Sequence, residues 1–127
     1  MLLLDTHVCL WLVAAPERIG PATREAIQRA SRVSYSSITL AEIAIKRMLG
    51  RLDVPADLGA VFDSAGLVHL PFTGDHAGAL ELFPDLARLD PFDRMLLAQA
   101  AVEGHRLVTA DARLLAAGGR HVLDARG

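Results

Sequence analysis

Four acidic side chains occur where short apolar runs end or helical stretches begin. They are Asp5, Glu42, Asp93 and Asp111. If they converge, they offer oxygen-only ligands, which favour Mg²⁺ or Mn²⁺. Zinc is disfavoured because no cysteine pair or histidine-rich spacing accompanies the acids. An ion held in this way activates water and stabilises charge on a phosphate, so the predicted chemistry is hydrolysis of a phosphodiester bond.

Each acid also has a purely structural explanation as part of a helix cap. The stretch 39–42 fits a capping box with Thr39 as N-cap, and Asp90 reads as the N-cap of a helix with Pro91 in its first turn. Asp5 and Asp111 fit simple N-caps. A cap stabilises a helix by about 1 kcal/mol and needs no catalysis to explain it.

The elements that position these acids follow from short apolar runs that alternate with helical stretches. Strands are expected at 2–4, 33–36, 67–70, 106–109 and 121–123. Helices are expected at about 6–14, 21–30, 39–49, 55–65, 74–82 and 91–103, with a short one from 111. This alternation predicts βαβ units and a parallel sheet covered on both faces.

A parallel sheet would bring the four acids to one place. Asp5 and Asp111 follow strands, and Glu42 and Asp93 are expected in the first turns of helices that begin at the same edge. Four carboxylates facing one crevice would repel one another. Helix N-termini offset part of that repulsion and a divalent cation offsets far more. We therefore expect capping and metal binding together.

Basic side chains near the acids are candidates for contacts to phosphate. They are His7, Lys46, Arg47 and Arg94. Each has an alternative: His7 as a packed or solvent-facing residue, Lys46 in an i,i+4 ion pair with Glu42, and the arginines on a solvated face. We assign Trp11 and Phe92 to the core, because the aromatic residues are too dispersed to form a base-stacking platform.

Length and composition set limits on the function. The 127 residues fit a single domain, 1–127, and the net charge of −2 excludes a general basic coat for nucleic acid, so any such contact must be local. No apolar run reaches the roughly 20 residues that cross a bilayer. The start of the chain lacks the basic region of a signal peptide, which indicates a cytoplasmic protein.

Four motifs, in order along the chain, resemble those of PIN-domain proteins, in particular the VapC toxins. They are Leu3-Leu4-Asp5-Thr6-His7 followed by Leu10-Trp11, then Ser37-x-Thr39-x-x-Glu42, then Asp90-Pro91-Phe92-Asp93-Arg94 followed by Leu97-Ala98-Gln99-Ala100, and Leu107-Val108-Thr109-Ala110-Asp111. Each motif is weak alone, but their order and spacing match over essentially the whole chain.

This resemblance implies a three-layer α/β/α fold with a short parallel central sheet and an Mg²⁺- or Mn²⁺-dependent endoribonuclease. Asp5, Glu42 and Asp93 match the core acids and Asp111 the fourth, which ligates the ion directly or through water. Thr109 or Thr6 supports the site, and Lys46, Arg47 or Arg94 steadies the RNA. Asp90 is one turn before Asp93, so either can face the metal. We prefer Asp93.

The resemblance also implies partners: a cognate small VapB-like antitoxin, an RNA substrate and a second copy of the chain in a homodimer. Two alternatives remain. One is a catalytically inactive PIN-like module that binds protein or RNA. The other is a phosphatase with Asp5 as nucleophile, which is disfavoured because His7 stands where such enzymes carry a second aspartate.

Overall fold

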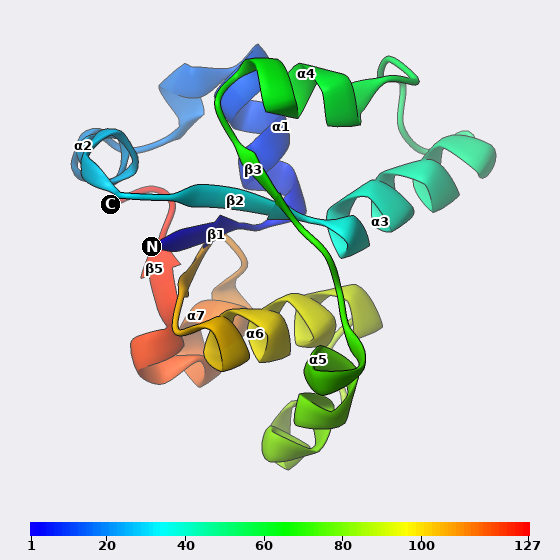
Figure 1. Ribbon diagram of the computed structural model, residues 1–127, viewed down its shortest axis with the longest axis vertical. Coiled ribbons are helices and arrows are strands. Elements are labelled where there is room, and N and C mark those ends of the chain that lie inside the picture. Colours follow the sequence, from blue (N-terminus) through cyan, green and yellow to red (C-terminus); the bar gives the residue numbers. More distant parts are fainter.

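Five short strands form one parallel sheet in the order β3-β2-β1-β4-β5, with β1 at its centre (Figure 1). The computed structural model describes all residues 1–127. The strands are β1 (Leu2–Leu4), β2 (Val33–Ser36), β3 (Val68–Leu70), β4 (Arg106–Thr109) and β5 (Val122–Asp124). All five lie within one residue of the runs expected from the sequence.

Seven α-helices connect these strands, with short 3-10 turns between some of them. The helices are α1 (Thr6–Ala14), α2 (Pro21–Arg29), α3 (Ser37–Met48), α4 (Leu58–Ser64), α5 (Gly74–Gly78), α6 (Pro91–Glu103) and α7 (Ala112–Ala117). The 3-10 turns are η1 (Pro16–Arg18), η2 (Ala79–Leu82), η3 (Pro84–Leu86) and η4 (Gly119–His121).

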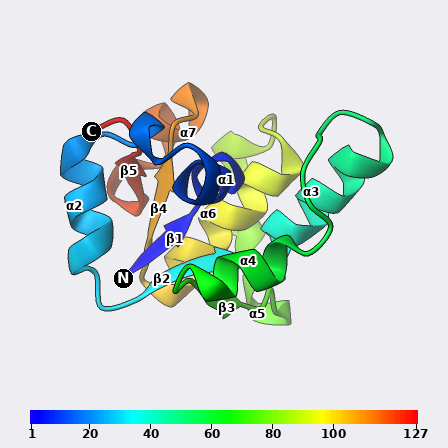
Figure 2. The same ribbon diagram turned by 90° about the horizontal axis from the view of Figure 1, so that it is seen from above.

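The sheet divides the interior into two hydrophobic cores. Side chains alternate between the faces of a strand, so Leu2 and Leu4 enter one core while Leu3 enters the other. Helices α1 and α4 cover the first face and α6 and α7 the second, as Figures 1 and 2 show. The predicted three-layer α/β/α architecture is therefore confirmed.

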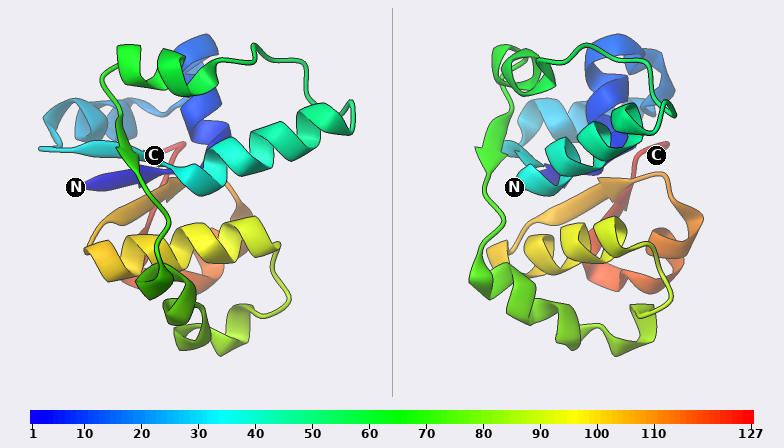
Figure 3. Two further views of the ribbon diagram at one scale, coloured as in Figure 1. Left: turned by 45° about the vertical axis from the view of Figure 1, so that its right-hand side comes forward. Right: turned by 90° about the vertical axis from the view of Figure 1, so that its right-hand side faces the viewer.

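The carboxyl ends of the central strands lead almost directly into helices. β1 is followed by α1 after one residue, β2 by α3 with none, and β4 by α7 after two. The right panel of Figure 3 looks toward this edge, where the first turn of α3 lies close to α6. None of the α-helices combines the length and the apolar character that a membrane span requires.

Three helix predictions were wrong in their bounds. The helix expected from 39 starts at Ser37, because the Ser36 side chain accepts a hydrogen bond from the Ile38 N–H at 2.9 Å. The helix expected from 55 starts at Leu58, since Leu52 and Val54 pack on the core before it begins. The segment 74–82 is α5 followed by the 3-10 turn η2.

Candidate active site

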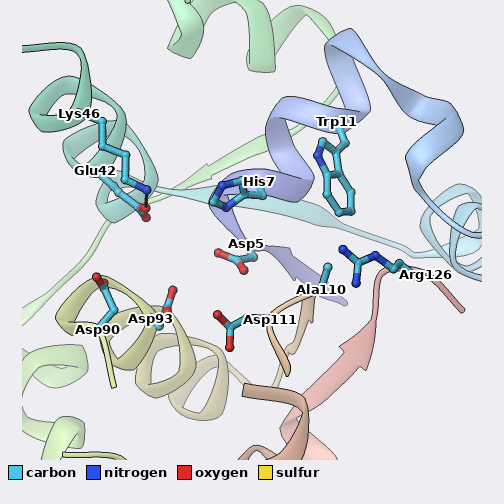
Figure 4. A pocket seen from close by; sticks show the side chains of 10 residues that line it. All are labelled: Asp5, His7, Trp11, Glu42, Lys46, Asp90, Asp93, Ala110, Asp111 and Arg126. Atoms are coloured by element: carbon cyan, nitrogen blue, oxygen red, sulfur yellow. Dashed lines mark hydrogen bonds and ion pairs between the residues drawn. The ribbon is translucent and has the colours of Figure 1, made fainter. Parts of the chain in front are cut away.

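A cleft of about 300 Å³ opens at the carboxyl edge of the sheet (Figure 4). Half of its ten lining residues are acidic: Asp5, Glu42, Asp90, Asp93 and Asp111. The others are His7, Trp11, Lys46, Ala110 and Arg126. In a chain of net charge −2, this is a strong local concentration of carboxylates.

Asp5 is held rigidly at the end of β1. It is the N-cap of α1 and is 5% exposed. One carboxylate oxygen, Oδ1, accepts from the Thr6 N–H at 2.7 Å, and Oδ2 accepts from the Thr109 hydroxyl at 2.7 Å. The fully buried Thr109 thus fixes Asp5 from the neighbouring strand β4.

Thr109 also positions Asp111. Its Oγ1 accepts a hydrogen bond from the Asp111 N–H at 3.1 Å. Asp111 is the N-cap of α7, and its Oδ1 accepts from the N–H groups of Arg113 and Leu114. The other oxygen, Oδ2, makes no hydrogen bond within the chain and is free to bind a ligand.

Glu42 does not belong to a capping box, which corrects the sequence analysis. Ser36 is the N-cap of α3, so Glu42 lies in the second turn rather than the first. Its Oε1 accepts from the Thr6 hydroxyl at 2.8 Å, and that hydroxyl lies 3.1 Å from the Thr39 hydroxyl. Its Oε2 accepts from Lys46 Nζ at 2.6 Å. Both Glu42 oxygens therefore have partners, and the side chain is almost completely buried.

Asp90 and Asp93 both line the cleft from the start of α6, but they differ in their contacts. Asp90 is the N-cap, as expected, and its Oδ1 accepts from the Phe92 N–H at 2.8 Å. Asp93 is half-buried one turn later and makes no hydrogen bond within the chain. Of the five acids, Asp93 alone has no partner of its own.

The electrostatics of the cleft reflect this crowding. Burial, together with the negative charges of Asp5, Asp90, Asp111 and Glu42, raises the pKa of Asp93 to about 7. Burial also raises the pKa of Asp5, although hydrogen bonds from Thr109 and Thr6 and the charge of His7 act against this shift. Negative charge in the cleft is thus only partly offset by the protein.

The cleft fits a hydrated hard cation better than a fully dehydrated one. No three His, Cys, Asp or Glu side chains are close enough to form a ready-made ligand set. Mg²⁺ keeps several waters and commonly binds through one or two carboxylates, so the remaining acids can reach it through water. The oxygen-only donors and the unpartnered Asp93 suit such an ion.

The structure separates the other predicted site residues into two groups. His7 and Lys46 line the cleft, and Lys46 forms the expected ion pair with Glu42. Arg47 and Arg94 do not line the cleft, and their contact with RNA stays a prediction. The buried Arg94 Nε has no hydrogen-bond partner, and nothing in the structure explains this.

Besides Ala110 and the capping residue Asp90, two cleft residues, Trp11 and Arg126, were not among the predicted site residues. Trp11 was assigned to the core, but it packs on the core only in part and also lines the cleft. It lies one helical turn after His7, so a shared helix face was a usable signal. Arg126 lies in the last residues of the sequence, where no motif marks it.

The family is decided by comparison with known sequences. The family model described as PIN domain matches residues 2–119, nearly the whole chain. The chain belongs to the PIN domain family. Among curated proteins, this PIN domain is similar to ribonuclease VapC22 of Mycobacterium tuberculosis, with 30% identity over 122 residues and 88% of each chain covered. The family inferred from the motifs is therefore confirmed.

Solved structures share the fold of this PIN domain. The structure of VapBC2 from Rickettsia felis, bound to a DNA fragment from its promoter, matches with a TM-score of 0.70 at 16% identity. The match covers 95% of this chain and 96% of that chain. A toxin-antitoxin complex from Klebsiella pneumoniae matches with a TM-score of 0.69 at 17% identity and 98% coverage of both chains. At these identities the comparison establishes the fold alone.

Proposed function

We propose that this PIN domain is an endoribonuclease that depends on Mg²⁺ or Mn²⁺ and hydrolyses RNA phosphodiester bonds in the acidic cleft. The observation that carries the proposal is the convergence of Asp5, Glu42, Asp93 and Asp111 from four separate elements on one cleft. The similarity to a protein named ribonuclease VapC22 supports the choice of RNA as substrate.

Asp5, Asp93 and Asp111 would hold a hydrated ion, one or two of them directly and the rest through its bound water, and Glu42 would complete the site through water. The ion supplies an activated water and stabilises charge on the scissile phosphate. The chain supplies the positioning. Thr109 fixes Asp5, Thr6 and Lys46 fix Glu42, and Asp93 keeps both oxygens available. His7 lines the cleft wall (Figure 4), where it would contact a phosphate or a leaving group.

Cleavage of a labelled single-stranded RNA by the purified protein tests this proposal. We expect cleavage in Mg²⁺ and none in EDTA. Asp93→Asn should reduce the rate by at least about a hundredfold, because it removes a charge that acts on the reacting groups. Asp90→Asn is the matched control. It removes a charge from the same helix start and keeps the cap, so most of the activity should remain.

Cleavage by Asp93→Asn at the wild-type rate would contradict the assigned site. If the wild-type protein does not cleave any RNA in Mg²⁺ or Mn²⁺, the alternative of a non-catalytic PIN-like module is favoured instead.

We further propose that the chain is the toxin of a type II toxin–antitoxin system and acts in the cytoplasm. Its structural neighbours include a toxin-antitoxin complex and a VapBC assembly, which supports a small VapB-like antitoxin as partner. Expression of the chain alone should arrest growth, and co-expression with the product of the adjacent small reading frame should restore it. Light scattering of the purified chain tests the expected homodimer. A chain that never arrests growth at high expression would contradict the toxin assignment.

A further inference from the structure

Trp11 and Arg126 form a cation–aromatic pair in the wall of the cleft. The guanidinium carbon of Arg126 lies 5.8 Å from the centre of the Trp11 ring, and both residues line the cleft. A guanidinium held against an aromatic ring keeps its in-plane N–H groups free. Those donors can bind a phosphate in a bidentate manner while the stacking is maintained.

The segment that carries Arg126 is held in place by backbone hydrogen bonds. The Ala125 N–H donates to the Thr109 carbonyl at 2.8 Å, and the Gly20 N–H donates to the Ala125 carbonyl at 2.9 Å. The Arg126 N–H itself donates to Asp124 Oδ1 at 2.9 Å. The Thr109 hydroxyl also donates to Asp5. Thr109 therefore holds both Asp5 and the backbone of Ala125, the neighbour of Arg126.

Arg126 also differs from the other basic residues of the cleft. Lys46 is committed to Glu42 at 2.6 Å, whereas Arg126 forms no salt bridge. Figure 4 shows Lys46 and Arg126 on opposite sides of the acids. The Arg126 side of the cleft therefore offers a positive charge that no carboxylate of the protein neutralises.

We propose that Arg126, oriented by Trp11, binds a backbone phosphate of single-stranded RNA next to the phosphate that is cut. This inference rests on the proposed function, since it assigns how the same cleft holds its RNA. Arg126 is the binding residue and Trp11 is a positioning residue. An RNA strand would then extend from the acids toward the Trp11–Arg126 wall.

Arg18 provides a matched control for this proposal. Its guanidinium carbon also lies 5.8 Å from the Trp11 ring centre, but Arg18 does not line the cleft. Arg126→Gln and Arg18→Gln therefore remove the same charge and the same kind of aromatic contact. Only Arg126→Gln removes a donor from the cleft.

The experiment measures binding of a fluorescent 10-nucleotide RNA of mixed sequence by anisotropy, in Ca²⁺ in place of Mg²⁺, at several salt concentrations. We expect Arg126→Gln to weaken binding by about tenfold and to lower the slope of log affinity against log salt by about 0.7, as for one lost phosphate contact. Arg18→Gln should stay within about twofold of wild type, because Arg18 is exposed and lies outside the cleft, where salt screens its charge.

Trp11 gives a second readout, because it is the only tryptophan in the chain. At an RNA concentration near the wild-type Kd, RNA should change its fluorescence clearly in the wild-type and Arg18→Gln proteins and much less in Arg126→Gln. Trp11→Leu should weaken RNA binding nearly as much as Arg126→Gln does, and Trp11→Phe should restore most of it. If Trp11 positions Arg126, Trp11→Leu should also lower the slope of log affinity against log salt. If Trp11 has only a structural role, Trp11→Leu should leave this slope unchanged.

Equal RNA affinity of Arg126→Gln and Arg18→Gln, whether both match wild type or both are weakened, would overturn the inference. Binding in Ca²⁺ does not require cleavage, so this result is independent of the test of ribonuclease activity. A wild-type protein that cleaves RNA but shows no Arg126 dependence would refute only this inference. A wild-type protein that binds no RNA would refute both.

Discussion

At the residue scale, Thr109 links the parts of the site that come from β1, β4 and α7. Its hydroxyl donates to Asp5 and accepts from the backbone of Asp111, and the side chain is fully buried. A single hydroxyl therefore sets the relative position of two carboxylates. Hydrogen bonds of this kind, behind the groups that bind an ion, commonly tune the affinity of the site.

Thr109→Val should lower the free energy of unfolding by about 1–3 kcal/mol, because it leaves a buried Asp5 oxygen unpaired. It should also weaken Mn²⁺ binding, since Asp5 loses a hydrogen bond that favours its charged form. Urea unfolding and calorimetric titration measure the two effects. Thr109→Ser keeps the hydroxyl and should retain most of the Mn²⁺ affinity. A valine variant with unchanged Mn²⁺ affinity would show that Thr109 has no such role.

Asp93 makes stability depend on pH in the direction opposite to a salt-bridged carboxylate. Its pKa is about 7 in the folded protein, against an ordinary value of 3.8. Between these values the folded state holds a proton that the unfolded state releases. The Asp93 carboxylate therefore costs no stability below about pH 4. Its cost grows as the pH rises from about 4 to about 7 and levels off above that.

Asp93→Asn should accordingly raise the free energy of unfolding at pH 8, in EDTA, by about 1–2 kcal/mol, a figure reduced because solvent screens a half-buried group. The gain over wild type should shrink at pH 5. Urea unfolding at both pH values measures it, with Asp90→Asn as the control. An equal gain at pH 5 and pH 8 would show that the charge of Asp93 is not the cause.

At the scale of elements, helix starts place the acids, but not always in the way that local sequence indicates. Ser36, Ser37 and Thr39 are all good N-cap residues, so local propensity does not choose among them. The choice is made by tertiary contacts: the Thr39 hydroxyl faces that of Thr6, and Ser36 ends β2 and caps α3. This shift moves Glu42 out of the first turn and toward Thr6.

Asp111 allows capping and ion binding to be separated within one element. Asp111→Ala should lower the free energy of unfolding by about 1 kcal/mol, because α7 loses its cap, whereas Asp111→Asn should leave it nearly unchanged. Both variants should weaken Mn²⁺ binding, because both remove the charge. Thermal unfolding and Mn²⁺ titration measure the pair. Full Mn²⁺ affinity in Asp111→Asn would restrict Asp111 to its capping role.

At the scale of the whole molecule, the sequence predicted the features that depend on burial and on the alternation of strands with helices. Strands buried on both faces read as short apolar runs, so 2–4 and 106–109 were recognisable, and the acids that follow them fell at one edge. The Trp11–Arg126 wall was not predictable, because backbone hydrogen bonds fold the last residues back onto β4 and leave no side-chain pattern.

Whether the four carboxylates form one divalent-cation site is tested most directly by calorimetric titration of the metal-free protein with Mn²⁺ at pH 8. We predict saturable binding to the wild type, at least about tenfold weaker binding to Asp93→Asn, and binding to Asp90→Asn within about twofold of wild type. Absence of saturable binding to the wild type, or equal affinity of Asp93→Asn and wild type, would contradict a metal site built on these acids.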